Sequence, residues 1–158
     1  MRYVQHLLIP VLVSLAACSP KVETDAELAT RAGAPLFEGM GAFHRGIDTK
    51  HPAAQRYFNQ GMVLAFGFNH AESIRSFRAA QNLDPECAMC FWGEALATGP
   101  NINVTAKGKA VMSADEQTAA WIALGKARAV ATGKPQIESD LIDALGKRYA
   151  PEPVTDRD

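Results

Sequence analysis

The sequence predicts an all-α protein. The 158-residue chain is 47% apolar and 21% charged, which is typical of a globular protein and excludes disordered, collagen-like and low-complexity classes. Alanine is abundant while aromatic residues make up only 8% of the chain, which favours close-packed helices. The alternation of Val, Ile, Thr and Tyr that a sheet protein needs is scarce, and from residue 52 onward apolar residues recur at helical spacing. The length suffices for one domain but is too short for two full-sized ones.

Acidic and basic residues nearly balance in this chain. There are 17 Asp and Glu residues against 16 Lys and Arg residues, for a formal charge of −1, and no run is rich in lysine or arginine. Nucleic-acid backbones are bound by clustered positive charge. We therefore expect no nucleic-acid partner.

The first residues of the chain have the pattern of an export signal. Arg2 precedes an apolar run over residues 7–17, which is shorter than the roughly 20 residues that a membrane-spanning helix needs. Such a run is typical of the hydrophobic region of a secretory signal peptide. It ends in Leu15-Ala16-Ala17-Cys18, which resembles the lipobox of bacterial lipoproteins.

The resemblance to lipoproteins implies that residues 1–17 are a signal peptide and that Cys18 becomes the lipidated first residue of the mature chain. Several acyl chains at one residue give stable membrane anchoring, whereas a single chain binds only marginally. Ser19, where an aspartate would direct retention, favours the outer membrane with the domain facing the periplasm; the inner membrane and secretion are alternatives. The other interpretation is an ordinary secretory signal cleaved after Ala17, which leaves Cys18 unmodified.

Residues 18–50 mix charged residues with Gly, Pro, Ala and Thr and show no sustained apolar period. We interpret them as the lipidated cysteine and a flexible tether that holds the domain away from the membrane. A short helix over residues 25–31 is the alternative. The helical domain is then expected over residues 51–150, with a C-terminal tail over residues 151–158.

Local signals divide the helical domain. Asn69 and Ser113 are expected to be N-caps, because each is followed three residues later by a glutamate. Asp84 is expected to cap a third helix in which Pro85 takes the first position. A polar loop follows over residues 99–112. The residues expected to face the core of the last two helices are Trp121, Leu124, Ala127, Ile137, Leu141, Leu145 and Tyr149.

The first two helices and the Asp-Pro step after them resemble a tetratricopeptide repeat (TPR). The matching positions are Tyr57, Gly61, Ser73, Phe77, Ala80 and Pro85. Two positions depart from the pattern, since Gln60 stands where leucine is usual and Leu64 where an aromatic residue is usual. Gly93 comes two residues earlier than the next repeat would place it. The resemblance implies antiparallel helix pairs of an α-solenoid, in which small residues let the helices approach closely.

A wider resemblance covers residues 41–149, which look like a bacterial group of exported TPR proteins. Members of that group are longer chains with no settled biochemical role. The resemblance implies that this sequence corresponds to the N-terminal part of a longer TPR protein.

Cys87 and Cys90 are the chemically most informative residues. Two cysteines three positions apart share one face of a helix, close enough for a disulfide. Three interpretations stay open: a structural disulfide or a pair of small buried side chains, a thiol–disulfide redox site, and a metal site. Attachment of a c-type haem is excluded, because it needs histidine where Phe91 stands.

A metal site needs a further ligand, and His70 is the candidate. It opens the second helix and could lie near the cysteines if both flank turns between helices. Two thiolates and an imidazole would suit zinc or copper(I). Without this site, no cofactor is expected.

The leading functional hypothesis is a membrane-anchored scaffold that binds a protein or peptide and catalyses no reaction. No nucleophile elbow, zinc-protease motif or phosphate-binding glycine loop is present in the sequence. Helix pairs of this kind build a concave groove for an extended segment or a helix. The groove residues expected by helix position are Asn59, Met62, Phe66, Trp92 and Glu94. The alternatives are a metal- or redox-handling accessory protein that uses Cys87 and Cys90, and a truncated fragment.

Overall fold

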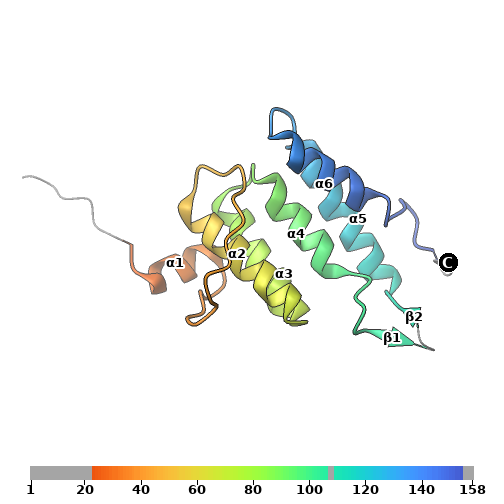
Figure 1. Cartoon of the computed structure of the whole chain (residues 1–158), viewed down its shortest axis with the longest axis horizontal. Helices are drawn as coiled ribbons and strands as arrows, with labels where there is room; N and C mark the ends of the chain where they lie inside the picture. Colours follow the sequence, from red (N-terminus) through yellow and green to blue (C-terminus); the bar gives the residue numbers. More distant parts are fainter. Residues whose placement is uncertain (1–22, 107–108, 155–158) are drawn as a thin grey trace, which may run out of the picture.

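The computed structural model describes residues 23–106 and 109–154, and Figure 1 shows the arrangement of their helices. The expected signal peptide and Cys18 lie outside the described residues. The helices are α1 (Asp25–Ala32), α2 (Pro52–Phe66), α3 (His70–Leu83), α4 (Ala88–Thr98), α5 (Ala114–Ala129) and α6 (Gln136–Gly146). Two-residue strands, β1 (Thr105–Ala106) and β2 (Lys109–Ala110), pair antiparallel inside the expected polar loop. The all-α prediction is confirmed. Among the described residues, no helix combines the length and apolarity needed to cross a bilayer.

The predicted caps of α3 and α5 are present. The Asn69 side chain accepts a hydrogen bond from the backbone N–H of Glu72. Ser113 and Glu116 form a capping box in which each side chain bonds the backbone of the other residue. Both caps satisfy N–H groups that have no partner within the helix.

The start of α4 differs from the prediction. The helix begins at Ala88, and Cys87 rather than Asp84 is its N-cap, with its sulfur 3.2 Å from the Cys90 nitrogen. Asp84 instead closes a turn before the helix, where its Oδ1 accepts a hydrogen bond from the Glu86 N–H at 3.1 Å. The aspartate side chain therefore satisfies a local amide in a turn and does not cap α4, while the Asp84 residue is the C-cap of α3.

Phe77 joins α2, α3 and α4 at the centre of the core. Its ring fills the space beside Gly61 on α2 and Gly93 on α4, and a Cβ atom at either glycine would overlap the ring. The Phe58 ring lies against it, with the two centroids 5.6 Å apart. The absence of side chains at the two glycines therefore lets three successive helices close around one aromatic ring. This gives Gly93 a packing role, although it departs from the expected motif spacing.

The region interpreted as a tether is structured from residue 23 onward. Leu28 and Ala32 of α1 are buried against α3, and Asn82 of α3 donates a hydrogen bond to the Ala32 carbonyl at 2.9 Å. The expectation of a flexible tether is therefore wrong over residues 23–50, and the alternative helix is the observed one. An eight-residue helix buries only two positions, which is too few to produce a visible apolar period.

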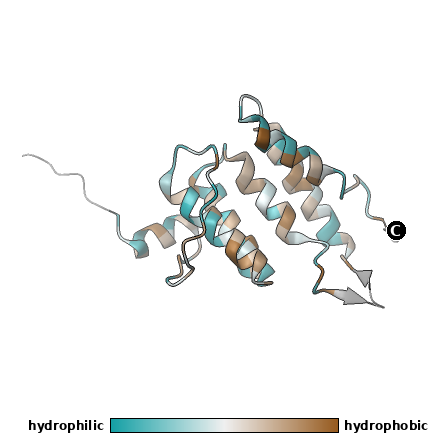
Figure 2. Cartoon of the chain, viewed as in Figure 1, coloured by the Kyte–Doolittle hydropathy of each residue, from teal (hydrophilic) through white to brown (hydrophobic). Residues whose placement is uncertain are grey.

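The inward face of α6 is rotated from the one expected. Leu145 and Tyr149 are buried as expected, but Ile137 is 59% exposed and Ile142 is buried in its place. The expected residues are spaced by four, and each step of four turns the helix by about 40° more than a full circle. The direction in which these side chains point therefore shifts progressively along α6. Apolar residues nevertheless concentrate where α4, α5 and α6 face one another, as the colouring of Figure 2 shows.

Candidate functional site

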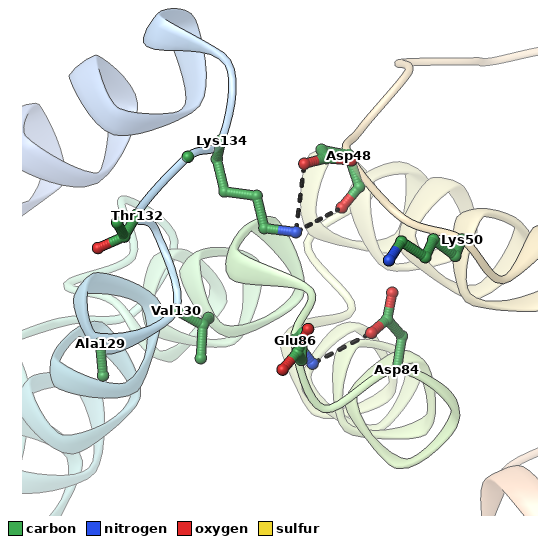
Figure 3. A pocket seen from close by; sticks show the side chains of 9 residues that line it. Asp48, Lys50, Asp84, Glu86, Ala129, Val130, Thr132 and Lys134 are labelled. Atoms are coloured by element: carbon green, nitrogen blue, oxygen red, sulfur yellow. Dashed lines mark hydrogen bonds and ion pairs between the residues drawn. The ribbon is translucent and has the colours of Figure 1, made fainter.

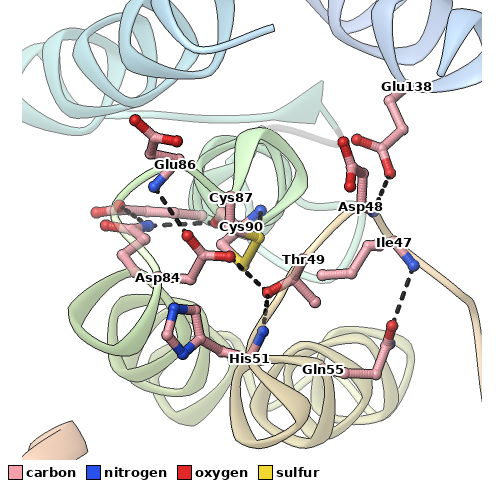
Figure 4. The surroundings of a disulfide bond; sticks show 12 residues. Ile47, Asp48, Thr49, His51, Gln55, Asp84, Glu86, Cys87, Cys90 and Glu138 are labelled. Carbon is pink, nitrogen blue, oxygen red and sulfur yellow. Dashed lines mark hydrogen bonds between the residues drawn. A yellow bond between two sulfur atoms is a disulfide. The ribbon is translucent and has the colours of Figure 1, made fainter. Parts of the chain in front are cut away.

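Cys87 and Cys90 are joined by a disulfide. Both residues are fully buried, next to the segment that precedes α2 (Figure 4). The sulfur atoms are therefore not accessible to a dissolved thiol in this structure. A bridge that closes so short a loop is worth about 2 kcal/mol by loop-closure entropy.

His70 does not lie near the disulfide. It opens the 14-residue helix α3, whereas Cys87 follows the other end of that helix, so about 20 Å of helix separates them. The His70 Nε2 atom instead lies 2.7 Å from Oδ1 of Asn103. The expectation that the turns would bring His70 to the cysteines is wrong, because the two turns flank opposite ends of α3. Within residues 23–106 and 109–154, no group of three or more His, Cys, Asp or Glu residues is placed to hold a metal ion.

Three of the five expected groove residues are part of the core. Met62, Trp92 and Glu94 are buried. The Trp92 indole donates to the Leu141 carbonyl at 3.0 Å, while Glu94 accepts hydrogen bonds from Arg78. These side chains are occupied by contacts within the chain, so the expectation that they line an open groove is wrong.

The remaining two groove candidates are accessible or bind another part of the chain. Phe66 is exposed at the end of α2. Asn59 lies partly buried under residues 34–50, which we call the strap. The strap connects α1 to α2 and lies against α2 (Figure 1).

Gln60 of α2 holds the first part of the strap. Its side-chain oxygen accepts the Phe37 N–H at 2.7 Å, and its side-chain nitrogen donates to the Pro35 carbonyl at 3.0 Å. The same nitrogen also lies 3.0 Å from the Ser76 hydroxyl of α3. One turn away, the Tyr57 hydroxyl donates to the Ala34 carbonyl. Every strap group in these contacts is a backbone group.

Gln55 and Asn59 hold the second part of the strap in the same way. The Gln55 oxygen accepts the Ile47 N–H at 3.0 Å, and its nitrogen donates to the Arg45 carbonyl at 2.8 Å. The Asn59 oxygen accepts the Arg45 N–H at 3.3 Å. Amides of glutamine and asparagine can donate and accept at once, so they match the alternating groups of an extended backbone.

The strap then crosses from α2 to α6, as Figure 4 shows. The Glu138 carboxylate accepts the Asp48 N–H at 2.7 Å, and Lys134 pairs with the Asp48 carboxylate at 3.2 Å. The next strap residue, Thr49, donates from its hydroxyl to Asp84. Burial raises the pKa of the Glu138 carboxyl, and the hydrogen bond from the Asp48 amide offsets part of that effect.

Two polar atoms at this contact, one on the strap and one on α6, are incompletely satisfied. The Nε atom of Arg45 and the Oε2 atom of Glu138 are buried without a hydrogen-bond partner among the described residues. An unsatisfied buried donor or acceptor costs about 1–3 kcal/mol. The Glu138 carboxylate on α6 is thus not fully satisfied by this particular segment.

A polar hollow of about 370 Å³ lies where the end of the strap meets the α3–α4 and α5–α6 turns (Figure 3). Its charged lining consists of Asp48, Lys50, Asp84, Glu86 and Lys134. Carboxylates and ammonium groups are mixed, and Lys134 is already paired with Asp48. This mixed-charge lining can bind small polar groups.

The chain was compared with protein-family models, curated proteins and solved structures. None of the three comparisons found a match. The site must therefore be interpreted from its own geometry, and the strap is its best-defined feature.

One sequence signal could have indicated the strap. Gln55 and Asn59 lie about one turn apart on α2, and Gln60, about 100° further round the helix, departs from the repeat pattern. Side-chain amides carry both donors and an acceptor, so amides close together on a helix are able to bind an extended backbone. The strap residues themselves carry no comparable signal, because most of their hydrogen bonds to α2 are made through the backbone.

Proposed function

We propose that this chain is a membrane-anchored, TPR-like scaffold that binds an extended segment of a protein partner and catalyses no reaction of its own. The observation that carries the proposal is the way α2 and α6 hold the strap. Gln55, Asn59 and Gln60 bind its backbone N–H and C=O groups, and Glu138 binds a further N–H. Recognition through the backbone is tolerant of sequence, so the same side chains can hold a different extended segment.

The partner segment would replace the strap or extend alongside it. The unpartnered Oε2 atom of Glu138 supports this, because a better-fitting segment can donate the hydrogen bond that the strap leaves unmade. The strap remains covalently attached, so its local concentration is high and it competes with any partner. Binding should therefore be weak in the intact chain and stronger once the strap is loosened.

A peptide-binding experiment tests this proposal. The probe is a fluorescein-labelled synthetic peptide with the sequence of residues 34–50, measured by fluorescence anisotropy. The acceptor is a variant in which residues 36–48 are replaced by a Gly-Ser repeat of equal length. Such a flexible segment loses more conformational entropy than the native strap when it becomes ordered, so it competes less with the peptide. We expect saturable binding with a Kd on the order of 10–100 μM and at least roughly tenfold weaker binding to the unmodified chain.

Two modified peptides serve as matched controls. N-methylation at Phe37, Arg45 and Ile47 removes the donors that Gln60, Asn59 and Gln55 accept, and should weaken binding at least roughly tenfold. N-methylation at Glu38 and Phe43, whose N–H groups donate to no side chain in the described part of the chain, should change affinity far less. Equal affinities for the two peptides, or no binding of the unmodified peptide, would contradict backbone recognition.

The proposed anchor is a lipid at Cys18, placing the domain at the outer membrane on the periplasmic side. The lipobox-like residues before Cys18 support it. In bacteria grown with radiolabelled palmitate, the chain should incorporate label and the Cys18→Ser variant should not. A chain that is processed but unlabelled would indicate an ordinary secretory signal instead.

A further inference from the structure

Exposed apolar side chains gather at one edge of the molecule. Phe66 ends α2 and Phe68 lies in the α2–α3 turn, and they are 64% and 57% exposed. Ile102, in the loop after α4, is 79% exposed. Phe43 of the strap is also exposed. We call these four residues the aromatic edge. In Figure 1 the α2–α3 turn and the loop leading to β1 lie at the same lower side of the molecule.

Direct contacts join these segments into one surface. The rings of Phe43 and Phe66 meet edge to face with their centroids 6.0 Å apart. The Phe68 ring meets the His70 ring at 6.3 Å, and His70 contacts Asn103, the neighbour of Ile102. The strap, the α2–α3 turn and the loop before β1 therefore present their apolar side chains together.

Phe68 is held in this surface against its backbone preference. Its φ of 61° lies in the left-handed region, where glycine or asparagine is the usual residue and a bulky side chain is strained. Because the Phe68 ring is exposed, its packing contacts offset little of the energy of this backbone strain. An aromatic residue at this turn is thus unexplained by folding, and an aromatic side chain directed outward is what a binding surface needs.

The chain itself indicates which partner this surface meets. Asp25 pairs with Arg56 at 3.2 Å, and Phe66 lies ten positions after Arg56, or about 15 Å along α2. Residues 18–22 can span at most about 17 Å. If Cys18 carries the proposed lipid, the membrane surface is within reach of the aromatic edge. This step rests on the proposed anchor.

We propose that the aromatic edge inserts into the lipid surface at the boundary between headgroups and acyl chains. Phenylalanine and aliphatic side chains at such a boundary leave water without exposing charge to the hydrocarbon. The side chains project from turns and loops, so they can enter the lipid while the helices stay outside it. The edge then orients the anchored domain on the membrane.

Vesicle binding tests the edge separately from the anchor. The protein is the chain from Ser19 onward, which keeps every described residue and cannot be lipidated at Cys18. It is sedimented with vesicles of phosphatidylethanolamine and phosphatidylglycerol. We expect measurable binding that persists in about 0.5 M NaCl, because apolar insertion is not screened by salt. The Phe66→Ser/Phe68→Ser variant should bind at least roughly tenfold more weakly.

The Ile122→Ser/Ile137→Ser variant is the matched control. These two residues are 52% and 59% exposed but lie on α5 and α6, outside the edge, so their replacement should leave vesicle binding unchanged. Circular dichroism checks that both variants keep their helices.

Several results would overturn the proposal. These are absence of vesicle binding by the unsubstituted chain, an equal loss in both double variants, and loss of binding in high salt. A dimer that only Phe66→Ser/Phe68→Ser dissociates would assign the edge to contacts between copies of the chain. Failure of palmitate labelling or of peptide binding leaves these vesicle results unchanged, so the proposals can fail separately.

Discussion

The Gly93→Ala variant is expected to lose about 2–3 kcal/mol of its free energy of unfolding, as measured by urea denaturation. The added methyl group would overlap the Phe77 ring, which already contacts Phe58 and lies beside Gly61. The ring is held on several sides, so it cannot move aside without disturbing α2 as well. The loss from overpacking exceeds the roughly 0.5–1 kcal/mol that alanine normally gains over glycine inside a helix.

Gly125 provides the matched control for this prediction. It also lies inside a helix, α5, but a Cβ atom there meets nothing within 4 Å. The Gly125→Ala variant should therefore be more stable by about 0.5–1 kcal/mol. In a Phe77→Leu background, the penalty of Gly93→Ala should shrink, because the obstructing ring is gone. A stable Gly93→Ala variant, or a penalty that survives Phe77→Leu, would contradict the packing argument.

The helices could be predicted because their signals are local. Asn69 and Ser113 define helix starts through contacts with residues three positions away, and Gly61 marks a close helix approach within one repeat-like unit. Such contacts depend only on the nearby sequence. The direction that a helix face points depends on its neighbours and is harder to predict.

The groove residues Trp92 and Glu94 illustrate this difficulty. The helix α4 buries residues on all of its sides, so its sequence does not reveal which side faces a groove and which faces the core. Glu94 looks like a surface charge in sequence, yet it is buried and bonded to Arg78 and Gln81 of α3. Partners more than ten positions away determine its environment.

The strap was missed for a different reason. It is extended, short and bound to α2 mostly through its backbone, so neither apolar periodicity nor side-chain type distinguishes it from a flexible linker. The information lies on the receiving helix, in Gln55, Asn59 and Gln60. Gln60 was visible only as a departure from the repeat pattern, and the structure gives that departure a role in holding the strap.

Replacing Gln60 by the leucine that the repeat pattern usually has should release the first part of the strap. The substitution removes the bonds to Pro35, Phe37 and Ser76 and puts an apolar side chain of similar size in their place. We expect a loss of about 2 kcal/mol in the free energy of unfolding, since a leucine cannot satisfy the polar groups that face it. Hydrogen exchange at the Phe37 amide should become fast, because that amide loses its acceptor.

The Gln136→Leu variant is the control for this effect. Gln136 is exposed on α6 and bonds only across one turn to Asp140 among the described residues, so its replacement should change stability by no more than about 0.5 kcal/mol. Amides of α5 and α6 should keep their protection in the Gln60→Leu variant, which distinguishes release of the strap from global unfolding. A Phe37 amide that stays protected would show that the strap is held by contacts other than the row of amides on α2. In that case α2 would no longer support recognition of an extended backbone.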